Sequence, residues 1–360
     1  MSAPPLLRVI LYAEVPNFYA SIERADHPAL VARAVIVGGD PRKRGLVQSA
    51  TADAQAAGVR LEMSMIEALQ LCPLARAFRT NMTRYREVSR RLHAWLRQGF
   101  ERLEPAGLGS AFFDLSGAAE PPQAIADRLQ QIVQRELGLP LRVGIGSGKV
   151  IARLAAEEAG EGGIRRVQPG EERRFLSLLP VTRLEGVGEK TAAKLAELGA
   201  RRIGEIPSIG RERLERSLGT HGLRILAFAE GRDDRLVRAT RHPQSVSREA
   251  TLALESRDTG VLAEHLQDLS QHLAAELQRQ GLSATRVALK LRFADQGGGT
   301  RSTTLATPTA HSRDLQEAAF ELLGRTEAGV RPVRSLRLQL AGLTLQGAED
   351  RQLDLFSTSS

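Results

Sequence analysis

Short apolar runs alternate with amphipathic stretches through the first half of the chain. Arg8–Val15 (RVILYAEV) is rich in β-branched and aromatic residues, which is typical of a buried strand. Pro16 cannot continue a strand ladder, and Asn17 favours a turn. We therefore expect the strand to end near Glu14 and a helix to begin at Phe18.

The same patterns predict further strands and helices as far as residue 165. The predicted strands are Ala34–Gly38, Leu46–Ser49, Ala111–Leu115 and Leu141–Ile145. The predicted helices are Thr51–Ala57, Ser64–Leu71, Asn81–Leu103, Pro122–Leu137 and Val150–Glu158. Because strands and helices do not alternate strictly, we expect an α+β fold or a mixed sheet.

The last hundred residues or so have a clearer order. Asp233–Pro243 is basic and irregular, as expected of a linker between domains. Beyond it the predicted elements are strand Val246–Leu254, helix Thr259–Gln280, strands Thr285–Phe293 and Arg301–Leu305, helix Ser312–Gly324 and strand Val333–Leu345. This order predicts a βαββαβ domain around one sheet.

Composition narrows the class of partner. The 360 residues suggest about two to four domains. Lys and Arg number 50 against 42 Asp and Glu, a net charge of +8 that favours a polyanion such as nucleic acid. The single cysteine excludes an internal disulfide. With no secretory signal pattern and no bilayer-spanning apolar stretch, we expect a soluble, cytoplasmic, nucleoid-associated protein.

Two features suggest chemistry. Glu14 lies at the carboxyl end of a predicted strand, where it is either a metal ligand or an ordinary acid, solvated or paired with an arginine. Leu184–Leu198 (LEGVGEKTAAKLAEL) predicts two helices joined by a tight turn, Gly186-Val187-Gly188. Such a turn lets backbone amides approach a phosphate, so it resembles a helix-hairpin-helix DNA-binding element, with an ordinary helical hairpin as the alternative.

The basic residues Lys190, Arg238 and Arg241 extend the predicted DNA-binding surface, together with the sheet of the last domain. At the end of the chain lies Gln352-Leu353-Asp354-Leu355-Phe356, which resembles the pentapeptide that binds the bacterial β sliding clamp. The alternative is a chance amphipathic segment or a short edge strand.

These motifs, in this order, resemble a Y-family translesion DNA polymerase of the DinB/UmuC type. The resemblance is carried by Phe18-Tyr19-Ala20 with Glu23, Glu67-Ala68, Ala111–Leu115, Val143–Gly146 with Lys149, Leu184–Gly188 and the βαββαβ unit. It implies a multidomain right hand with a palm (1–33 and 77–165), fingers (34–76), a helix-hairpin-helix thumb (166–232), a linker (233–244), a little finger (245–345) and a tail (346–360).

The chain departs from the family at the metal ligands. Active members hold two divalent metal ions with an Asp-x-Asp on the first strand and an Asp-Glu before the strand AFFDL. The resemblance places Glu14 and Pro16 at the first pair, and Gly109 and Ser110 at the second. Because two-metal phosphoryl transfer needs oxygen ligands, we expect neither a metal site nor a cofactor.

The triphosphate ligands of the family also differ. Its Tyr and Arg in the fingers helix match Ala52 and Gln55, and its phosphate-binding Lys matches Gly160. Tyr19 matches the steric gate against ribonucleotides, although we interpret it as a core aromatic residue.

This pattern is similar to the ImuB-like branch, which keeps the fold and lacks the catalytic acids. It implies a pseudoenzyme: a DNA-binding adaptor for error-prone translesion synthesis in DNA repair and SOS mutagenesis. The implied partners are primer–template DNA, the β sliding clamp, an error-prone C-family DNA polymerase and an ImuA/RecA-like protein. Two alternatives stay open: an active polymerase with substitute acids (Asp53, Asp114 or Glu104), and a generic helix-hairpin-helix DNA binder.

Overall fold

The computed structural model describes the chain apart from residues 1–7, 99, 101, 239–243, 296 and 346–360. The chain divides into two compact units, Met1–Arg241 and His242–Ser360. Within the described part of the chain, no helix has both the length and the apolar character needed to cross a membrane.

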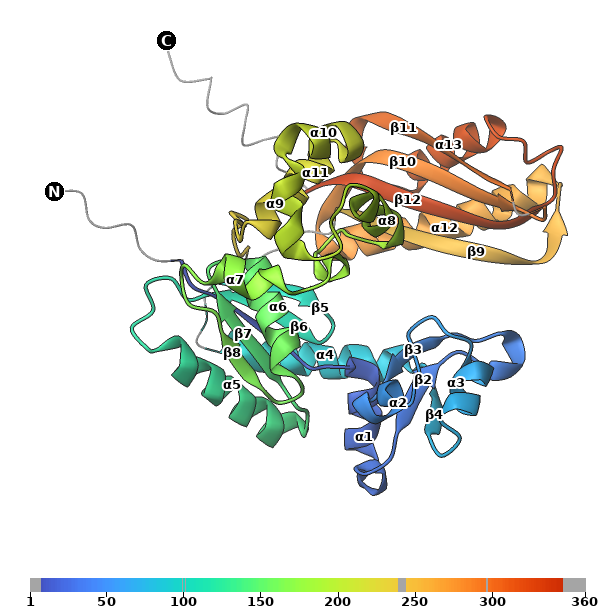
Figure 1. Ribbon diagram of the computed structural model, residues 1–360. Helices are drawn as coiled ribbons and strands as arrows, with labels where there is room; N and C mark the ends of the chain where they lie inside the picture. Colours follow the sequence, from blue (N-terminus) through green and yellow to red (C-terminus); the bar gives the residue numbers. More distant parts are fainter. Residues whose placement is uncertain (1–7, 99, 101, 239–243, 296, 346–360) are drawn as a thin grey trace, which may run out of the picture. The chain divides into compact units, whose positions relative to one another are not determined.

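The centre of the first unit is a five-stranded sheet, which we call the palm sheet (Figure 1). Its strand order is β5 (Leu103–Gly107), β6 (Ser110–Asp114), β1 (Ile10–Glu14), β7 (Arg142–Gly146) and β8 (Ile164–Arg166). Strand β1 runs antiparallel to both of its neighbours. In this register Glu14 lies opposite Ser110 on one side and opposite Arg142 on the other.

Helices cover both faces of the palm sheet because its strands are apolar on both. Helices α1 (Phe18–Asp26), α4 (Met82–Arg97) and α5 (Pro122–Leu137) contribute to the core that buries Leu11 and Ala13. Helix α6 (Lys149–Ala159) packs on the other face, against Tyr12. A Cβ on Gly144 would lie 1.9 Å from the carbonyl oxygen of Ala152 in α6, so this close packing requires glycine.

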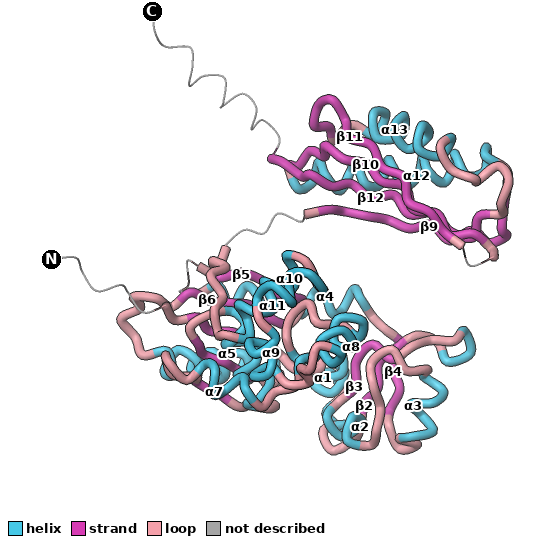
Figure 2. Tube along the Cα trace, turned by 45° about the horizontal axis from the view of Figure 1, so that its top comes forward, coloured by secondary structure: helices cyan, strands magenta, loops and turns pink. Residues whose placement is uncertain are grey.

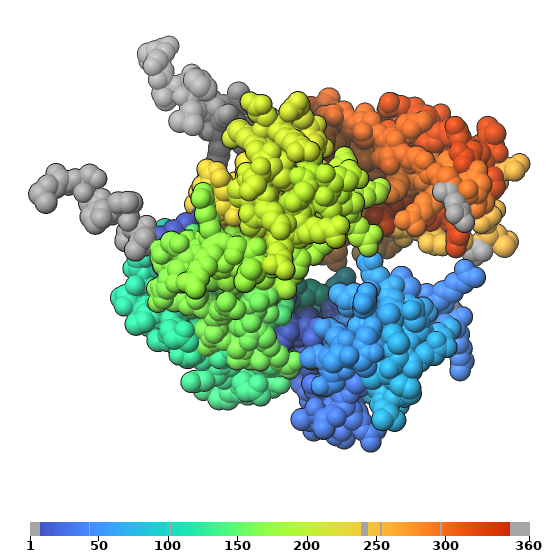
Figure 3. Space-filling view, in the orientation of Figure 1, coloured from blue at the N-terminus to red at the C-terminus, as the bar shows by residue number. Residues whose placement is uncertain are grey.

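A smaller sheet lies mostly in the segment predicted as the fingers, which we call the fingers; its residues are among those drawn in blue in Figure 3. Its strands are β3 (Val47–Ala50), β2 (Val35–Gly38) and β4 (Arg76–Arg79), packed with α2 (Ala52–Ala56) and α3 (Met65–Leu71). One-turn helices η1 (Pro28–Leu30) and η2 (Pro41–Lys43) flank β2.

One predicted boundary in this part of the chain is wrong, and one strand was not predicted. The predicted long helix Asn81–Leu103 ends at Arg97, and Leu103 begins strand β5. Strand β4 was missed, because its sequence RAFR is short and half charged; its parallel pairing with β2 makes it a strand.

Small helices make up the segment predicted as the thumb, which we call the thumb, and they share a core with one side of α6. They are α7 (Glu172–Ser177), η3 (Val181–Arg183), α8 (Glu189–Glu197), η4 (Ile203–Glu205), α9 (Ile206–Ile209), α10 (Arg211–Leu218) and α11 (Thr220–Ala229). The first helix of the predicted hairpin is the single turn η3 rather than a full helix.

The second unit is a four-stranded antiparallel sheet with both of its helices on one side (Figure 2). The elements follow as β9 (Ser245–Ser256), α12 (Thr259–Gln280), β10 (Leu282–Phe293), β11 (Gly298–Thr309), α13 (Ser312–Gly324) and β12 (Val333–Leu345). The predicted βαββαβ order is therefore confirmed, as is the α+β fold class. Apolar residues of the sheet and the helices form one buried core, which leaves the other sheet face to solvent.

Candidate active site and nucleic-acid interface

Glu14 forms an ion pair with Arg142 across the palm sheet. Both the Nε and the Nη2 of Arg142 donate to Oε2 of Glu14, at 2.9 and 2.6 Å. The side chains are 26% and 21% exposed, so the pair is partly open to solvent. Burial, and then the negative charge of Glu14, raise the pKa of the neighbouring Tyr12 to about 12. Of the interpretations open for Glu14, the structure therefore shows the acid paired with an arginine.

The ion pair lines a cleft of about 450 Å³ between the palm and the fingers. The palm contributes the end of β1, the start of α1 and the turn from Gly107 to Ser110, and the fingers contribute Gln48, Ser49 and Leu61. Among the described lining residues, Glu14 is the one carboxylate and Arg142 the one cation.

The other predicted metal-ligand positions offer little to a cation. Pro16 is buried, and its carbonyl accepts a hydrogen bond from the Ser21 hydroxyl. A Cβ on Gly109 would lie 2.5 Å from the ring of Phe18, so the structure leaves no room for an acid there. Ser110 is 7% exposed. No group of three or more His, Cys, Asp or Glu suited to a metal occurs among the described residues, so the cleft does not fit two metal ions held by three carboxylates.

The three acids considered as substitutes lie outside the cleft and have partners of their own. Asp53 pairs with Arg24 at 2.6 Å, and Asp114 with Arg102 at 3.7 Å. Glu104 is buried, and its carboxylate accepts from Nζ of Lys149 at 2.5 Å and from the backbone amide of Arg238 at 2.8 Å. The structure therefore does not bring these acids together with Glu14.

The residues at the positions matched to the family's triphosphate ligands also lie away from the cleft. Gln55 donates to the Asn17 side chain at 2.7 Å and to the carbonyl of Ala50, which ties the fingers helix to the turn after β1. Ala52 is exposed at the start of α2, and Gly160 ends α6 with φ +75°. None of the three lines the cleft.

Tyr19 is partly buried, and its ring stacks on that of Tyr85 at 4.4 Å between centroids. It also packs against the palm core and lines the cleft. Tyr19 therefore has both a core side, as interpreted, and a cleft side, as the steric-gate match implies.

The thumb turn presents backbone amides at the start of α8. Val187 is 6% exposed and anchors the turn in the thumb core. Gly186 has φ +87°, and Gly188 has open space where a side chain would project. Nε2 of His221 lies 3.0 Å from the carbonyl oxygen of Gly186, so helix α11 contacts the turn and supports its conformation. Lys190 is exposed on α8, where it adds positive charge beside the free amides.

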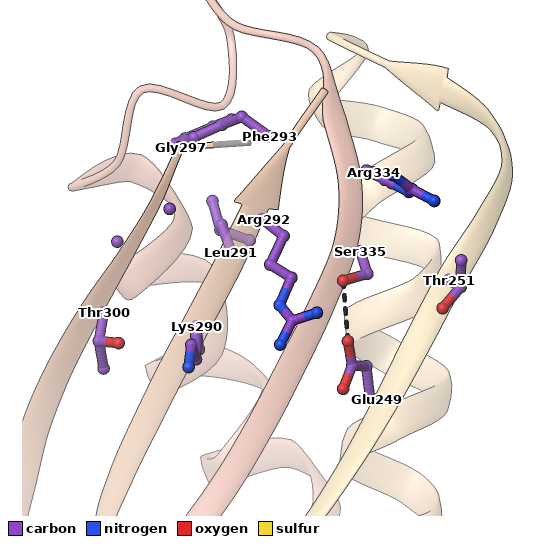
Figure 4. Close-up of a pocket in the computed structure, with 12 residues that line it drawn as sticks. Glu249, Thr251, Lys290, Leu291, Arg292, Phe293, Gly297, Thr300, Arg334 and Ser335 are labelled. Carbon is purple, nitrogen blue, oxygen red and sulfur yellow. Dashed lines mark hydrogen bonds between the residues drawn. The ribbon is translucent and has the colours of Figure 1, made fainter. Parts of the chain in front are cut away.

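A basic face lies on the second unit. Arg286, Lys290 and Arg292 are exposed at alternate positions of β10, on the side opposite its buried apolar residues. Figure 4 shows Lys290 and Arg292 beside Thr300 of β11 and Ser335 of β12, with the helices behind the sheet. A cavity of about 690 Å³ opens there.

One acid on this face, Glu249, reduces its net positive charge. Glu249 accepts hydrogen bonds from the guanidinium of Arg337 and from the hydroxyl of Ser335. The hydrogen bonds of Arg337, and then that of Ser335, hold the pKa of Glu249 below its usual range. Arg286, Lys290 and Arg292 of β10, with the exposed Arg334 of β12 beside the same cavity, supply positive charge for phosphates.

The remaining predicted residues are not part of these two surfaces or lie outside the described residues. Arg238 is held at the palm through its backbone contact with Glu104. Arg241 and the pentapeptide Gln352–Phe356 lie outside the described residues. Sequence reasoning also missed Arg142 and His221; a charge inside the apolar run LRVGI was the one available signal for Arg142.

Two family matches cover most of the chain. The impB/mucB/samB family matches residues 14–157, and the C-terminal domain of the same family matches residues 243–355. A DNA polymerase IV of Halorhodospira halophila is 34% identical over 97% of this chain and 98% of its own length. A DNA polymerase IV of Caulobacter vibrioides is 35% identical over 97% of this chain and 86% of its own.

Solved structures support the fold. A Y-family DNA polymerase chimera of Dbh and Dpo4 superposes with a TM-score of 0.81 over 94% of this chain and all of its own, at 21% identity. An insertion ternary complex of Dbh DNA polymerase gives a TM-score of 0.74, also at 21% identity.

These relatives correct one expectation. The prediction that the protein is not an enzyme is wrong, because relatives 31–35% identical over nearly the whole chain are named as a DNA polymerase. The similarity likewise favours the active alternative over the ImuB-like adaptor.

Proposed function

Because the chain belongs to the impB/mucB/samB family of DinB-like, Y-family DNA polymerases, we propose that it is a DNA-directed DNA polymerase acting in translesion synthesis. The observation that carries this proposal is the similarity to DNA polymerase IV, which spans 97% of the chain. The substrate is then primer–template DNA with nucleoside triphosphates.

Two surfaces support a DNA substrate. The thumb turn offers the amides of a helix N-terminus with Lys190, and the little-finger sheet offers Arg286, Lys290 and Arg292. Backbone amides and basic side chains contact phosphates without reading bases, which suits an enzyme that must accept any sequence.

The palm cleft does not itself support the metal chemistry of the family. Glu14 is bound to Arg142, and the described residues do not supply the remaining carboxylates. The chain's own contribution in the cleft is steric and electrostatic. Tyr19 forms part of the wall, and Glu14 with Arg142 places opposite charges at the end of β1.

Primer extension tests the proposal. The purified full chain is given a labelled primer on an undamaged template and on a template with an abasic site, with Mg²⁺ or Mn²⁺. We expect extension on both, with no exonuclease shortening of the primer. A primer that stays at its starting length on both templates, under conditions where a DNA polymerase IV relative extends it, would contradict the proposal.

We also propose that the tail binds the sliding clamp through Gln352–Phe356. In this pentapeptide the Gln amide provides hydrogen bonds, and Leu353, Leu355 and Phe356 provide apolar groups for a peptide-binding groove. The C-family polymerase and the ImuA/RecA-like protein were expected only from the ImuB-like branch, so we do not carry them forward.

Replacement of both Leu355 and Phe356 by Ala should abolish binding to the clamp while DNA binding is retained. Surface plasmon resonance with immobilised clamp measures the first, and fluorescence anisotropy with labelled DNA measures the second. Equal clamp affinity of the double variant and the parent would exclude the tail as the docking site.

A further inference from the structure

The cation in the palm cleft is Arg142, and its position differs from every triphosphate ligand that the family resemblance suggested. It begins strand β7, and its guanidinium lies directly across the sheet from Glu14. The positions matched to the family's triphosphate ligands, Ala52, Gln55 and Gly160, carry no positive charge. If a phosphate enters this cleft, Arg142 is the described lining residue whose charge can receive it.

The Glu14–Arg142 pair is suited to exchange. About a quarter of each side chain is exposed, so solvent and an incoming ligand can reach the pair. A guanidinium donates two parallel hydrogen bonds to a phosphate as readily as to a carboxylate, and a triphosphate carries more negative charge than Glu14. An incoming phosphate therefore competes with Glu14 for the same donors.

The surroundings favour an anionic ligand over an apolar one. The cleft wall contains the polar side chains of Asn17, Gln48, Ser49 and Ser110 beside the ion pair. The backbone from Gly107 to Gly109 also lines the cleft. A phosphate can be hydrogen-bonded here without leaving a buried charge unpaired.

We propose that Arg142 binds the phosphate groups of a nucleoside triphosphate in the palm cleft, and that Glu14 is its internal competitor. The ligand exchanges places with the Glu14 carboxylate on the guanidinium, and no covalent step is involved. This inference deepens the proposed function by assigning its substrate a binding residue, but it concerns binding alone.

Substitution of Glu14 and substitution of Arg142 should change the affinity for triphosphate in opposite directions. Glu14→Gln removes the competing charge and its repulsion of the phosphate, so we expect about fivefold tighter binding of triphosphate, the equivalent of about 1 kcal/mol. Arg142→Gln removes the donors, so binding should fall to an undetectable level. A metal-ligand role for Glu14 predicts weaker binding in the Gln variant, and only when a divalent cation is present.

Isothermal titration calorimetry of the full chain in EDTA, with sodium tripolyphosphate and separately with dATP, measures these affinities. Arg102→Gln is the control, because it also removes an arginine paired with an acid, next to strand β5, but lies outside the cleft. Its affinity should equal that of the parent. Thermal unfolding of each variant checks the fold, and a gain in affinity in Glu14→Gln cannot come from misfolding.

Single-stranded DNA in the same experiment separates the two sources of phosphate. Arg142→Gln should lose triphosphate while DNA affinity changes little. Loss of DNA affinity with unchanged triphosphate binding would overturn the assignment, as would unchanged or weaker triphosphate binding by Glu14→Gln in EDTA. Because no primer is extended, failure here leaves the polymerase proposal standing, and failure of primer extension leaves this one standing.

Discussion

Individual charged residues of this protein are governed by partners that are distant in the sequence. Glu14 could be located from its strand, but its partner Arg142 lies 128 residues away and meets it only through the antiparallel register of β1 and β7. Glu104 of β5 likewise pairs with a residue distant in the sequence, Lys149 at the start of α6. Pairings of this kind depend on sheet topology, which local sequence patterns do not contain.

Asp233 gives a residue-scale prediction. Its carboxylate accepts a hydrogen bond from the amide of Val150 at the start of α6, at 3.0 Å, two from the guanidinium of Arg235 and one from the backbone amide of Arg235. Burial raises the pKa of Asp233, but the hydrogen bonds and charge of Arg235, with the Val150 amide, outweigh it and hold the pKa below its ordinary value. Because its pKa is lower in the folded state, ionised Asp233 stabilises the folded protein above the unfolded-state pKa of about 4. This stabilisation is lost as the pH falls through the folded-state pKa.

We expect Asp233→Asn to lower the free energy of unfolding by about 1–3 kcal/mol at pH 7, and the difference from the parent to shrink as the pH falls below about 4. Urea unfolding across this pH range measures both. The neighbouring Asp234→Asn is the control, since Asp234 is exposed. A difference that stays constant from pH 7 to acid would show that the charge of Asp233 is unimportant.

At the scale of whole elements, sequence patterns performed best where a long amphipathic or alternating stretch carries its own boundaries. Pro122–Leu137, Thr259–Gln280, Ser312–Gly324 and Val333–Leu345 match the structure residue for residue. Strand β4 and the end of α4 were missed, because each is decided by neighbouring elements rather than by periodicity. The helix before the thumb turn was overestimated for the same reason.

The thumb turn gives an element-scale prediction. Gly186 has φ +87°, and a Cβ there would lie 2.8 Å from the ring of His221. Gly186→Ala should therefore distort the turn and weaken DNA binding by at least tenfold, as measured by fluorescence anisotropy. Gly199→Ala is the control: its φ is +95°, so the backbone strain is similar, but nothing lies within 4 Å and it is outside the turn. Equal DNA affinities of the two variants would contradict a role for the turn.

The little-finger sheet gives a second prediction at the scale of an element. If Lys290 and Arg292 contact phosphates, replacing each by Ala should reduce the slope of log affinity against log salt by about 0.9 per lost contact. Arg313→Ala should leave the slope unchanged, because Arg313 lies on helix α13, on the covered side of the sheet. A slope unaffected by the double variant would exclude this face from DNA binding.

For the whole molecule, the residues at a few ligand positions suggested an inactive protein, whereas similarity over the whole chain indicates an enzyme. The positions of Pro16, Gly109 and Ser110 suggested a protein without catalysis. Similarity to DNA polymerase IV over 97% of the chain corrects that inference at the level of function. The sequence predicted the family and the βαββαβ unit because their signals are spread over many residues. The prediction about catalytic activity rested on only a few residues.

Template-directed incorporation of single nucleotides tests the central claim most directly. The full chain is mixed with primer–template DNA whose next template base is A, C, G or T, and each of the four nucleotides is supplied in turn with Mg²⁺ or Mn²⁺. We predict that the primer grows by one nucleotide and that the complementary nucleotide is preferred on each template. Incorporation that ignores the template base, or no incorporation on any template while DNA binding is intact, would contradict the assignment of this protein as a DNA polymerase.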